Sequence, residues 1–471
     1  MKIKNIFLVI LSLVAIVLPL LAVPTAAWLL PPQFEGSFTA VLDDKVDRLS
    51  TLDEPKIVVV GGSSVAFGLE SELIERYTGM PVVNFGLYAS LGTKLMLDLS
   101  RKHIKEGDII VLAPELDAQT LSMYFNSAQA LRATDGRADI LLDLPIDHAF
   151  SLLSASWDFA ADKISYMTGG APSFDGVYSA DSFNERGDIV YPRPENTMPL
   201  YYDPNTEINL TEDILSADFS DYLNEYIEDA ERQGAEVYFS YCPMNSLALG
   251  DADPAAFADY LEGQINCTFI SNIEDYILDP GYFYDTNFHT NDAGARRRTV
   301  TLTEDLLLEL GIPTAVTDEV PPAPELPMLD LRYFGEDENA EYFEYATLAD
   351  GSYMITGVKD EYKGATALTV PLGYNTYKVT AIGAGAFDGT ELETLTVPED
   401  TNLRLFMNGA FLGAGKLTSL YIYYPTEENL LPPADFYGVA DGFTVYIPSG
   451  SAYTTGYYWS ERGLDFEYIK E

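Results

Sequence analysis

The chain has 471 residues, with 73 Asp and Glu against 27 Lys and Arg, and a formal net charge of -46. This charge argues against DNA, RNA and anionic membrane surfaces as partners, because phosphate binding needs basic patches. The length is too great for one ordinary hydrophobic core, so we expect two or more domains.

The N-terminal segment predicts a membrane anchor over residues 1–32. Lys2 and Lys4 precede an unbroken apolar run, Ile6 to Val23, which at about 1.5 Å per residue reaches about 27 Å, close to the hydrocarbon thickness. Cleaved signal peptides usually have a shorter apolar stretch, and Thr25 to Ala27 is a weak cleavage site. We therefore expect a single-pass protein of the cell membrane with its later domains outside the cytoplasm. Secretion after signal cleavage is the alternative.

Five short apolar segments predict strands: Lys56 to Val60, Pro81 to Phe85, Asp108 to Ala113, Glu236 to Tyr241 and Thr268 to Ser271. Helical patterns lie between most of them, such as Glu70 to Tyr77, and Thr299 to Leu310 predicts a closing helix. This alternation is typical of an α/β domain with helices on both faces of a parallel sheet. A long insertion, about Leu116 to Gln233, predicts a lid or a substrate-binding surface.

Two segments more than 200 residues apart carry candidate chemistry. GGSSVAFG (Gly61 to Gly68) places Ser63 and Ser64 on a tight turn after the first strand, and YDTNFHTNDAG holds Asp285 and His289. A serine hydroxyl needs a base, and a histidine base needs a carboxylate to fix its tautomer. The pattern predicts acyl transfer through a serine ester. The alternative is a plain loop pair in which Thr290 or Asn291 caps the next helix.

These residues resemble the SGNH/GDSL hydrolase superfamily. Gly62, Ser63, Ser64 and Gly68 occupy the places of its first block, so Ser64 matches the nucleophile and Ser63 replaces the usual Asp. Asp285 and His289 match the last block, four residues apart instead of three. The resemblance covers roughly residues 50 to 312, and implies a catalytic triad of Ser64, His289 and Asp285.

The same resemblance implies an oxyanion hole formed by the backbone N–H groups of Ser64 and Gly86. The family's third donor is an Asn side chain, but this chain reads VLAPELD and has Glu115 there. Loss of one such donor typically costs about 10²–10³ in rate. The remaining candidates for lining the site are Ser63, Asn84 and Glu115.

A Gly-Ser-Ser start resembles the membrane-anchored branch that includes the D-alanyl transfer protein of teichoic acid modification and, more distantly, alginate acetyltransferases. The resemblance implies a flavodoxin-like three-layer α/β/α domain over residues 33–312. It also implies an extracytoplasmic esterase or O-acyltransferase acting on acylated cell-envelope polymers or glycans. No metal or cofactor motif is present, and we expect neither. We expect Arg296 to Arg298 to form a solvated helix face, with contact to a substrate anion as the alternative. We expect Cys242 and Cys267 to form one disulfide or to remain two thiols.

Residues 313–335 are rich in Pro and acidic residues and predict an extended linker. Beyond it, GAF recurs at Gly385 to Phe387 and Gly409 to Phe411, with Phe436 marking a third copy. Short strands recur 25 residues apart, at Leu395 to Val397, Leu420 to Ile422 and Val445 to Ile447, with an earlier one at Ala367 to Pro371. Such a period predicts stacked units.

The phrases VTAIGAGAFDGT and KLTSLYIYYP in this region resemble BspA-like leucine-rich repeats of bacterial surface proteins. The resemblance implies a β-rich repeat solenoid over residues 336–471 that binds a protein or glycan. A plain β-rich accessory domain is the alternative. The second functional hypothesis is an inert SGNH-like surface protein that serves adhesion or scaffolding through its repeats.

Overall fold

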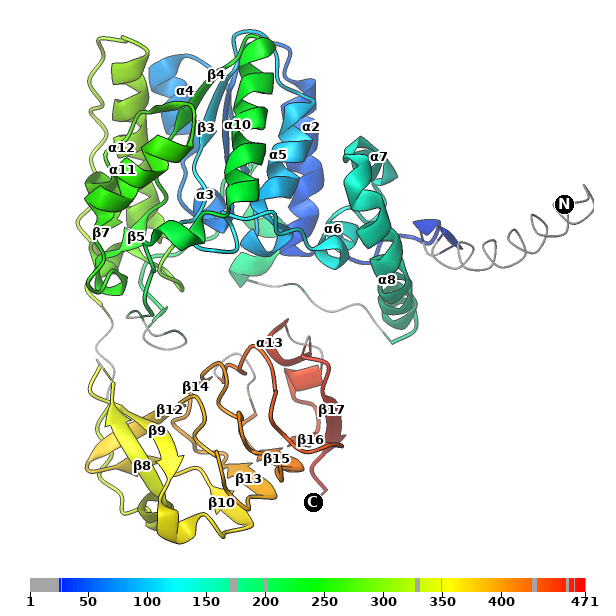
Figure 1. Cartoon of the computed structure of the whole chain (residues 1–471), viewed down its shortest axis with the longest axis vertical. Helices are drawn as coiled ribbons and strands as arrows, with labels where there is room; N and C mark the ends of the chain where they lie inside the picture. The colour runs from blue at the N-terminus through cyan, green and yellow to red at the C-terminus, as the bar shows by residue number, and fades with distance from the viewer. Residues whose placement is uncertain are drawn as a thin grey trace, which may run out of the picture. The chain divides into compact units, whose positions relative to one another are not determined.

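The computed structural model (Figure 1) describes residues 25–471 apart from 27, 170–173, 175, 199–201, 203, 205, 327–330, 349, 426–429, 455–456, 461 and 471. The chain divides into two compact units. The first comprises the residues to Asn196 together with Pro204–Leu326, and the second comprises Thr197–Asp203 and Pro327–Glu471. The main boundary, after Leu326, lies within the segment predicted as a linker.

Unit 1 is built on a five-stranded sheet in the order β2-β1-β3-β4-β6, and every pairing in it is parallel. Its strands lie within two residues of the predicted segments: β1 (Ile57–Gly61), β2 (Val82–Gly86), β3 (Ile109–Leu112), β4 (Glu236–Phe239) and β6 (Thr268–Phe269). The prediction of an α/β domain with a parallel sheet is confirmed. A separate two-stranded parallel sheet joins β5 (Met244–Asn245) to β7 (Ile277–Leu278).

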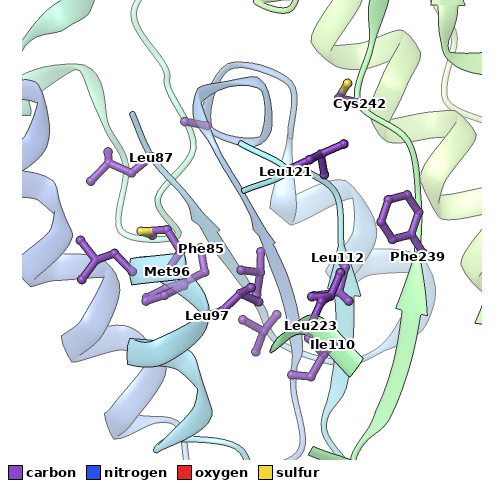
Figure 2. Close-up of a cluster of buried hydrophobic side chains, with 14 of the residues drawn as sticks. Phe85, Leu87, Met96, Leu97, Ile110, Leu112, Leu121, Leu223, Phe239 and Cys242 are labelled. Carbon is purple, nitrogen blue, oxygen red and sulfur yellow. The ribbon is translucent and has the colours of Figure 1, made fainter. Parts of the chain in front are cut away.

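Helices cover both faces of this sheet because its strands are apolar on both sides. Val58 and Val60 belong to the larger cluster of buried side chains, with residues of α2 (Leu42–Thr51), α5 (Thr93–Arg101), α10 (Ala217–Arg232) and α11 (Pro254–Gln264). Figure 2 shows part of this cluster, with Phe85 beside Met96 and Leu112 close to Leu223. Ile57 and Val59 face the other way, toward α4 (Ser71–Thr78) and α12 (Asp292–Glu309).

The long insertion between β3 and β4 forms a group of helices: α6 (Ser127–Ala133), α7 (Ala138–Asp143) and α8 (Ala149–Gly169), with short 3₁₀ turns. Phe159 of α8 stacks on Phe34 with ring centroids 5.9 Å apart. Lys163 of α8 forms a buried ion pair with Asp135, at 2.5 Å. The last part of the predicted insertion does not belong to this group of helices. It forms α10, which is one of the helices that cover the sheet.

Unit 2 contains a five-stranded parallel sheet in the order β10-β13-β15-β16-β17. Its strands are β10 (Ala367–Thr369), β13 (Thr394–Val397), β15 (Ser419–Ile422), β16 (Thr444–Ile447) and β17 (Asp465–Tyr468). Thr394 pairs with Ser419 and Ser419 with Thr444, so the three middle strands β13, β15 and β16 are 25 residues apart. A second sheet has the order β11-β12-β9-β8, comprising β11 (Gly373–Tyr374), β12 (Tyr377–Ile382), β9 (Tyr353–Val358) and β8 (Phe343–Thr347), and β14 (Leu405–Phe406) pairs with β12.

The GAF repeats of unit 2 align their aromatic rings into a ladder. Phe387 stacks on Phe411 with centroids 5.9 Å apart, and Phe411 stacks on Phe436 at 5.1 Å. The three copies recognised in the sequence are therefore neighbours in space. Unit 2 is β-rich, as predicted, and it buries a core of its own. A short helix, α13 (Tyr457–Ser460), precedes its last strand.

The first half of the predicted linker contacts unit 1. The backbone N–H of Thr317 donates to the Tyr77 hydroxyl, and Asp318 forms an ion pair with Arg76 at 2.9 Å. At the other end of the chain, the predicted anchor, Ile6 to Val23, lies outside the described residues. Within the described residues, no helix combines the length and apolarity needed to cross a membrane.

Candidate active site

The candidate site begins where the chain leaves β1 and turns into the short helix α3 (Ser63–Phe67). Gly62 is the last residue before this helix, and a Cβ atom there would lie 2.0 Å from Oε2 of Glu115. Gly86, at the end of the adjacent strand β2, is equally confined, since its Cβ would lie 2.3 Å from that of Val65. The two glycines allow the helix and the neighbouring strand ends to approach closely.

The structure brings Ser63, and not Ser64, to the histidine. Ser63 Oγ lies 2.8 Å from His289 Nε2, and His289 Nδ1 lies 2.8 Å from Asp285 Oδ1. The Ser64 hydroxyl is fully buried and has no hydrogen-bond partner in the described part of the chain. Successive helical side chains point about 100° apart, so only one of two adjacent serines can face the imidazole. The expected contact between Ser64 and His289 is therefore wrong in this geometry.

The histidine ring is held on several sides. Phe67, one turn beyond Ser63, stacks on it with centroids 4.1 Å apart and an angle of 5° between the planes. The His289 backbone N–H donates to Thr286 Oγ1 at 3.1 Å. The Tyr178 hydroxyl donates to Asp285 Oδ2, so each carboxylate oxygen of Asp285 accepts a hydrogen bond. These contacts fix the ring with Nδ1–H on the carboxylate and Nε2 toward Ser63.

Asn291 plays the capping role that the sequence offered as an alternative explanation of this loop. Its side-chain oxygen accepts from the Gly294 N–H at 3.0 Å at the start of α12. Its amide group donates to the carbonyl oxygens of Gly281 and Phe283. The loop therefore both caps the helix and presents Asp285 and His289, so the two explanations do not exclude each other.

Both backbone N–H groups expected to form the oxyanion hole already donate to side chains. The N–H of Ser64 donates to Glu115 Oε1 at 2.6 Å, and that of Gly86 donates to Asn84 Oδ1 at 3.2 Å. The Ser63 N–H opens the first turn of α3, where backbone N–H groups lack acceptors within the helix. Ser63 therefore supplies the hydroxyl facing His289 and a backbone donor beside it.

Glu115 occupies the place where the family has an Asn side chain, and it touches both serines. Oε1 lies 3.2 Å from Ser63 Oγ, and Oε2 has no hydrogen-bond partner among the described residues. Burial raises the pKa of Glu115, against the opposing effect of the Ser64 N–H. A neutral carboxylic acid has one O–H donor, so the protonated side chain can donate a hydrogen bond where an ionised one would repel negative charge.

Arg298 corrects one expectation directly. It is fully buried and donates through Nη1 to the Ser64 carbonyl at 2.6 Å, so this part of the basic run is not a solvated helix face. Arg296, in contrast, pairs with Glu70 at the surface. The Arg298 guanidinium thus holds the backbone of the serine turn through the Ser64 carbonyl. Burial lowers the pKa of Arg298.

Asn84, expected to line the site, accepts from the Gly86 N–H and also ties the insertion to the sheet. Its amide group donates to Asp188 Oδ1 at 2.9 Å, and its backbone oxygen accepts from the buried Lys45 ammonium. Burial lowers the pKa of Lys45 to about 7, partly offset by Asp188. Sequence reasoning identified neither of these residues, because they lie in segments without a recognisable motif.

The two cysteines are free thiols in the structure. Cys242 is buried, and burial raises its pKa above the ordinary range; burial raises the pKa of Cys267 to about 12. Neither thiol is ionised near neutral pH, and neither contacts the Ser63, His289 and Asp285 cluster by any hydrogen bond of the described residues.

Comparisons of the chain with protein-family models, with curated proteins and with solved structures found no match. The family resemblance therefore stays an inference from the motifs, and the case for function depends on the geometry around Ser63.

Proposed function

We propose that unit 1 is an SGNH-type serine esterase or O-acyltransferase, with Ser63 as nucleophile, His289 as general base and Asp285 as its orienting carboxylate. One observation carries the proposal: the continuous series of contacts from Ser63 Oγ through His289 to Asp285, each 2.8 Å long. The strand order and the two helix layers are compatible with the flavodoxin-like arrangement of that family. The site also lies at the carboxyl end of β1, where ligands bind in such sheets.

The reaction follows from the roles of these groups. His289 Nε2 takes the Ser63 proton as the oxygen attacks an ester carbonyl, and the developing oxyanion receives hydrogen bonds from the Ser63 N–H and from protonated Glu115. The imidazolium, stabilised by Asp285, then gives its proton to the leaving alkoxide. Attack of water on the acyl-Ser63 ester regenerates the enzyme as an esterase, and attack by a sugar or polyol hydroxyl gives acyl transfer.

The substrate class in this proposal is an acylated polymer or glycan of the cell envelope, and the setting is extracytoplasmic, with residues 6–23 as the membrane anchor. Unit 2 would be a BspA-like leucine-rich repeat domain that binds a protein or glycan. Its parallel strands in 25-residue register and its stacked Phe387, Phe411 and Phe436 support this reading.

A fluorophosphonate serine probe tests the chemistry. We expect the wild-type protein to be labelled, and labelling to disappear in Ser63→Ala and His289→Ala but to persist in Ser64→Ala. Because Ser63 is only 4% exposed, the reactive head group should be small. The two serine variants are matched controls, since they remove the same hydroxyl from adjacent positions. Loss of labelling in Ser64→Ala alone would reverse the assignment.

The alternative function is a catalytically inert surface protein that acts through its repeats. The observation favouring it is that Glu115 replaces the expected Asn and engages the Ser64 N–H. A folded wild-type protein that no fluorophosphonate labels would favour this alternative over the enzyme.

A further inference from the structure

Seven large apolar side chains on one segment of unit 1 are exposed together. They define the α8 outer face and comprise Leu142, Ile146, Phe150, Leu153, Trp157, Ile164 and Met167. On α8 itself the exposed positions recur every three, four or seven residues, which at about 3.6 residues per turn places them along one stripe. Phe150 is 84% exposed and Ile146 is 89% exposed. Isolated exposed apolar residues are ordinary, but a contiguous group marks an interaction surface.

The folding of unit 1 does not use this face. α8 packs inward through Phe159, which contacts Phe34, and through Lys163, which is paired with Asp135. α8 therefore packs on unit 1 through one side and carries a second, apolar face that the described residues do not cover, beside polar positions such as Asp158. An apolar stripe of this kind on an otherwise polar outer surface needs a further apolar surface against it.

The start of the described chain packs against the inward side of α8 and reaches the edge of the outer face at Leu153. The Trp28 ring lies 5.3 Å from that of Phe159, and Leu29 is 83% exposed. An open pocket at this junction is lined by Thr25, Trp28, Leu131, Leu141, Leu152, Leu153 and Ser156. The apolar run ends at Val23, and the residues from there to Trp28 extend at most about 18 Å even when fully stretched.

We infer that the α8 outer face lies in the interface of a lipid bilayer, with acyl chains covering its apolar side chains. This goes beyond the proposed chemistry and does not require it, but it rests on the proposed membrane anchor of residues 6–23. The short connection from residues 6–23 would hold the face at the surface of the membrane that this segment enters. Amphipathic surfaces of this kind sink about 5–10 Å into the headgroup region, and Trp is favoured at that depth.

Charge predicts which lipid suits this face. The chain has a net charge of -46, and the exposed residues next to the stripe include Asp147 and Asp158. Attraction to anionic headgroups therefore contributes nothing, and binding relies on burial of apolar surface. We expect association with neutral phosphatidylcholine.

The test uses the full chain reconstituted with phosphatidylcholine vesicles whose acyl chains carry bromine, which quenches tryptophan nearby. The chain has three tryptophans. Trp459 is fully buried in unit 2 and serves as an internal reference. We expect brominated lipid to quench emission of the wild-type protein, with most of the loss absent in Trp157→Phe. The Trp28→Phe variant shows how much of the quenching comes from Trp28 instead of Trp157.

A matched pair of variants tests the face itself. Phe150→Glu adds a charge on the outer face, and Leu308→Glu adds one on α12 at a side chain that is similarly exposed, 84% against 82%. We expect the first to reduce quenching of Trp157 several-fold and the second to leave it unchanged. Equal quenching in the two variants, unquenched Trp157 in vesicle-bound protein, or no binding to vesicles would each overturn the inference. Protection of Trp157 in native membranes but not in pure lipid would assign the face to a protein partner instead.

Discussion

Glu115 is the residue on which activity should depend most sensitively, because its carboxyl group contacts the hydroxyl of Ser63 and the N–H of Ser64. An ionised carboxylate beside the attacking oxygen would repel the negative charge that develops in the transition state. A protonated one would leave a donor in the place of the family's Asn. Burial raises the pKa of Glu115. The side chain therefore stays protonated, and able to donate, over a wider pH range than an exposed glutamate.

We predict a distinctive pH profile for Glu115→Gln. In the wild-type protein, kcat/KM for a small ester should fall as rising pH ionises Glu115, because a raised pKa means that the acid holds its proton until that point and loses it above. Glutamine does not titrate, so the variant should lack this alkaline fall. Glu185→Gln is the control, since Glu185 is exposed and pairs with Arg186 instead of with a residue of the candidate site. The same alkaline limb in all three proteins would contradict the role given to Glu115.

A second residue-scale prediction concerns Asp43 on α2. Burial raises its pKa from 3.8 to about 7, against the field of Arg137, and its Oδ1 has no hydrogen-bond partner in the described part of the chain. A carboxyl group with a raised folded-state pKa holds more protons when folded, so its contribution to stability is lost as pH rises toward that pKa. We expect Asp43→Asn to match the wild type near pH 4 and to gain on the order of 1 kcal/mol near pH 8, allowing for solvent screening.

Urea unfolding of both proteins at several pH values measures this difference directly. Asp44→Asn provides the control at the neighbouring exposed position. A stability difference between Asp43→Asn and wild type that does not change with pH would show that Asp43 has the same pKa in the folded and unfolded protein, and so would contradict the prediction.

The sequence located the candidate site but not the arrangement of its atoms. Asp285 and His289 were identifiable because a serine base requires that pair, and they are in contact in the structure. The resemblance assigned the nucleophile to Ser64, whereas the structure brings Ser63 to His289, because the choice between adjacent serines depends on where α3 begins. Tyr178 was missed because it reaches Asp285 from the insertion, 107 residues away along the chain, with no motif around it.

At the scale of elements, strands were easier to predict than helix starts. The strands of unit 1 are unbroken apolar runs such as Ile57–Gly61, so composition alone locates them. The closing helix was expected from Thr299 but begins at Asp292, because Asn291 caps a first turn that lacks apolar periodicity. The acidic linker likewise has a composition typical of free chain, yet Asp318 is held by Arg76.

The phenylalanine ladder of unit 2 provides an element-scale prediction. Phe411 is 1% exposed and lies between Phe387 and Phe436. Phe411→Ala should destabilise unit 2 by about 3–5 kcal/mol, the usual cost of deleting a buried phenylalanine. Thermal unfolding followed by near-ultraviolet circular dichroism would detect the loss.

Two further measurements make this prediction specific. Fluorophosphonate labelling of Ser63 should be unaffected in Phe411→Ala, because that residue belongs to the separate core of unit 2. Tyr437→Ala, at a side chain that is 75% exposed, should leave the unfolding transition unchanged. Equal destabilisation by the two alanine variants would mean that the stacked rings are not a source of stability.

At the scale of the whole molecule, the distribution of charge is more uneven than the net value suggests. Several of the few cations are withdrawn from the surface into ion pairs, including Lys56 with Asp108, Lys94 with Asp98 and Lys163 with Asp135. Each pair removes one cation and one carboxylate, so the excess of carboxylates set by the net charge of -46 stays on the surface, where fewer cations are left to offset it. These carboxylates repel one another in the compact state.

We expect salt to stabilise the folded protein as a consequence. Raising the ionic strength from about 0.01 M to about 0.1 M shortens the screening length from about 30 Å to about 10 Å, which weakens this repulsion. The Tm should rise over that range, to the same extent in sodium chloride and potassium chloride. A Tm that is unchanged or falls would show that attractive surface ion pairs outweigh the repulsion.

The regular register of unit 2 has a consequence for how its length can change. Strands β13, β15 and β16 are related by a constant shift of 25 residues, so each strand meets its neighbour through the same set of positions. Removal or duplication of one whole period between Val397 and Val445 would keep the register of the remaining strand pairs. It would also keep the remaining phenylalanine rings stacked on one another. An insertion or deletion of a single residue within a strand would instead turn its buried side chains to the surface. A change of one whole period should therefore be tolerated better than a one-residue change within β13, β15 or β16.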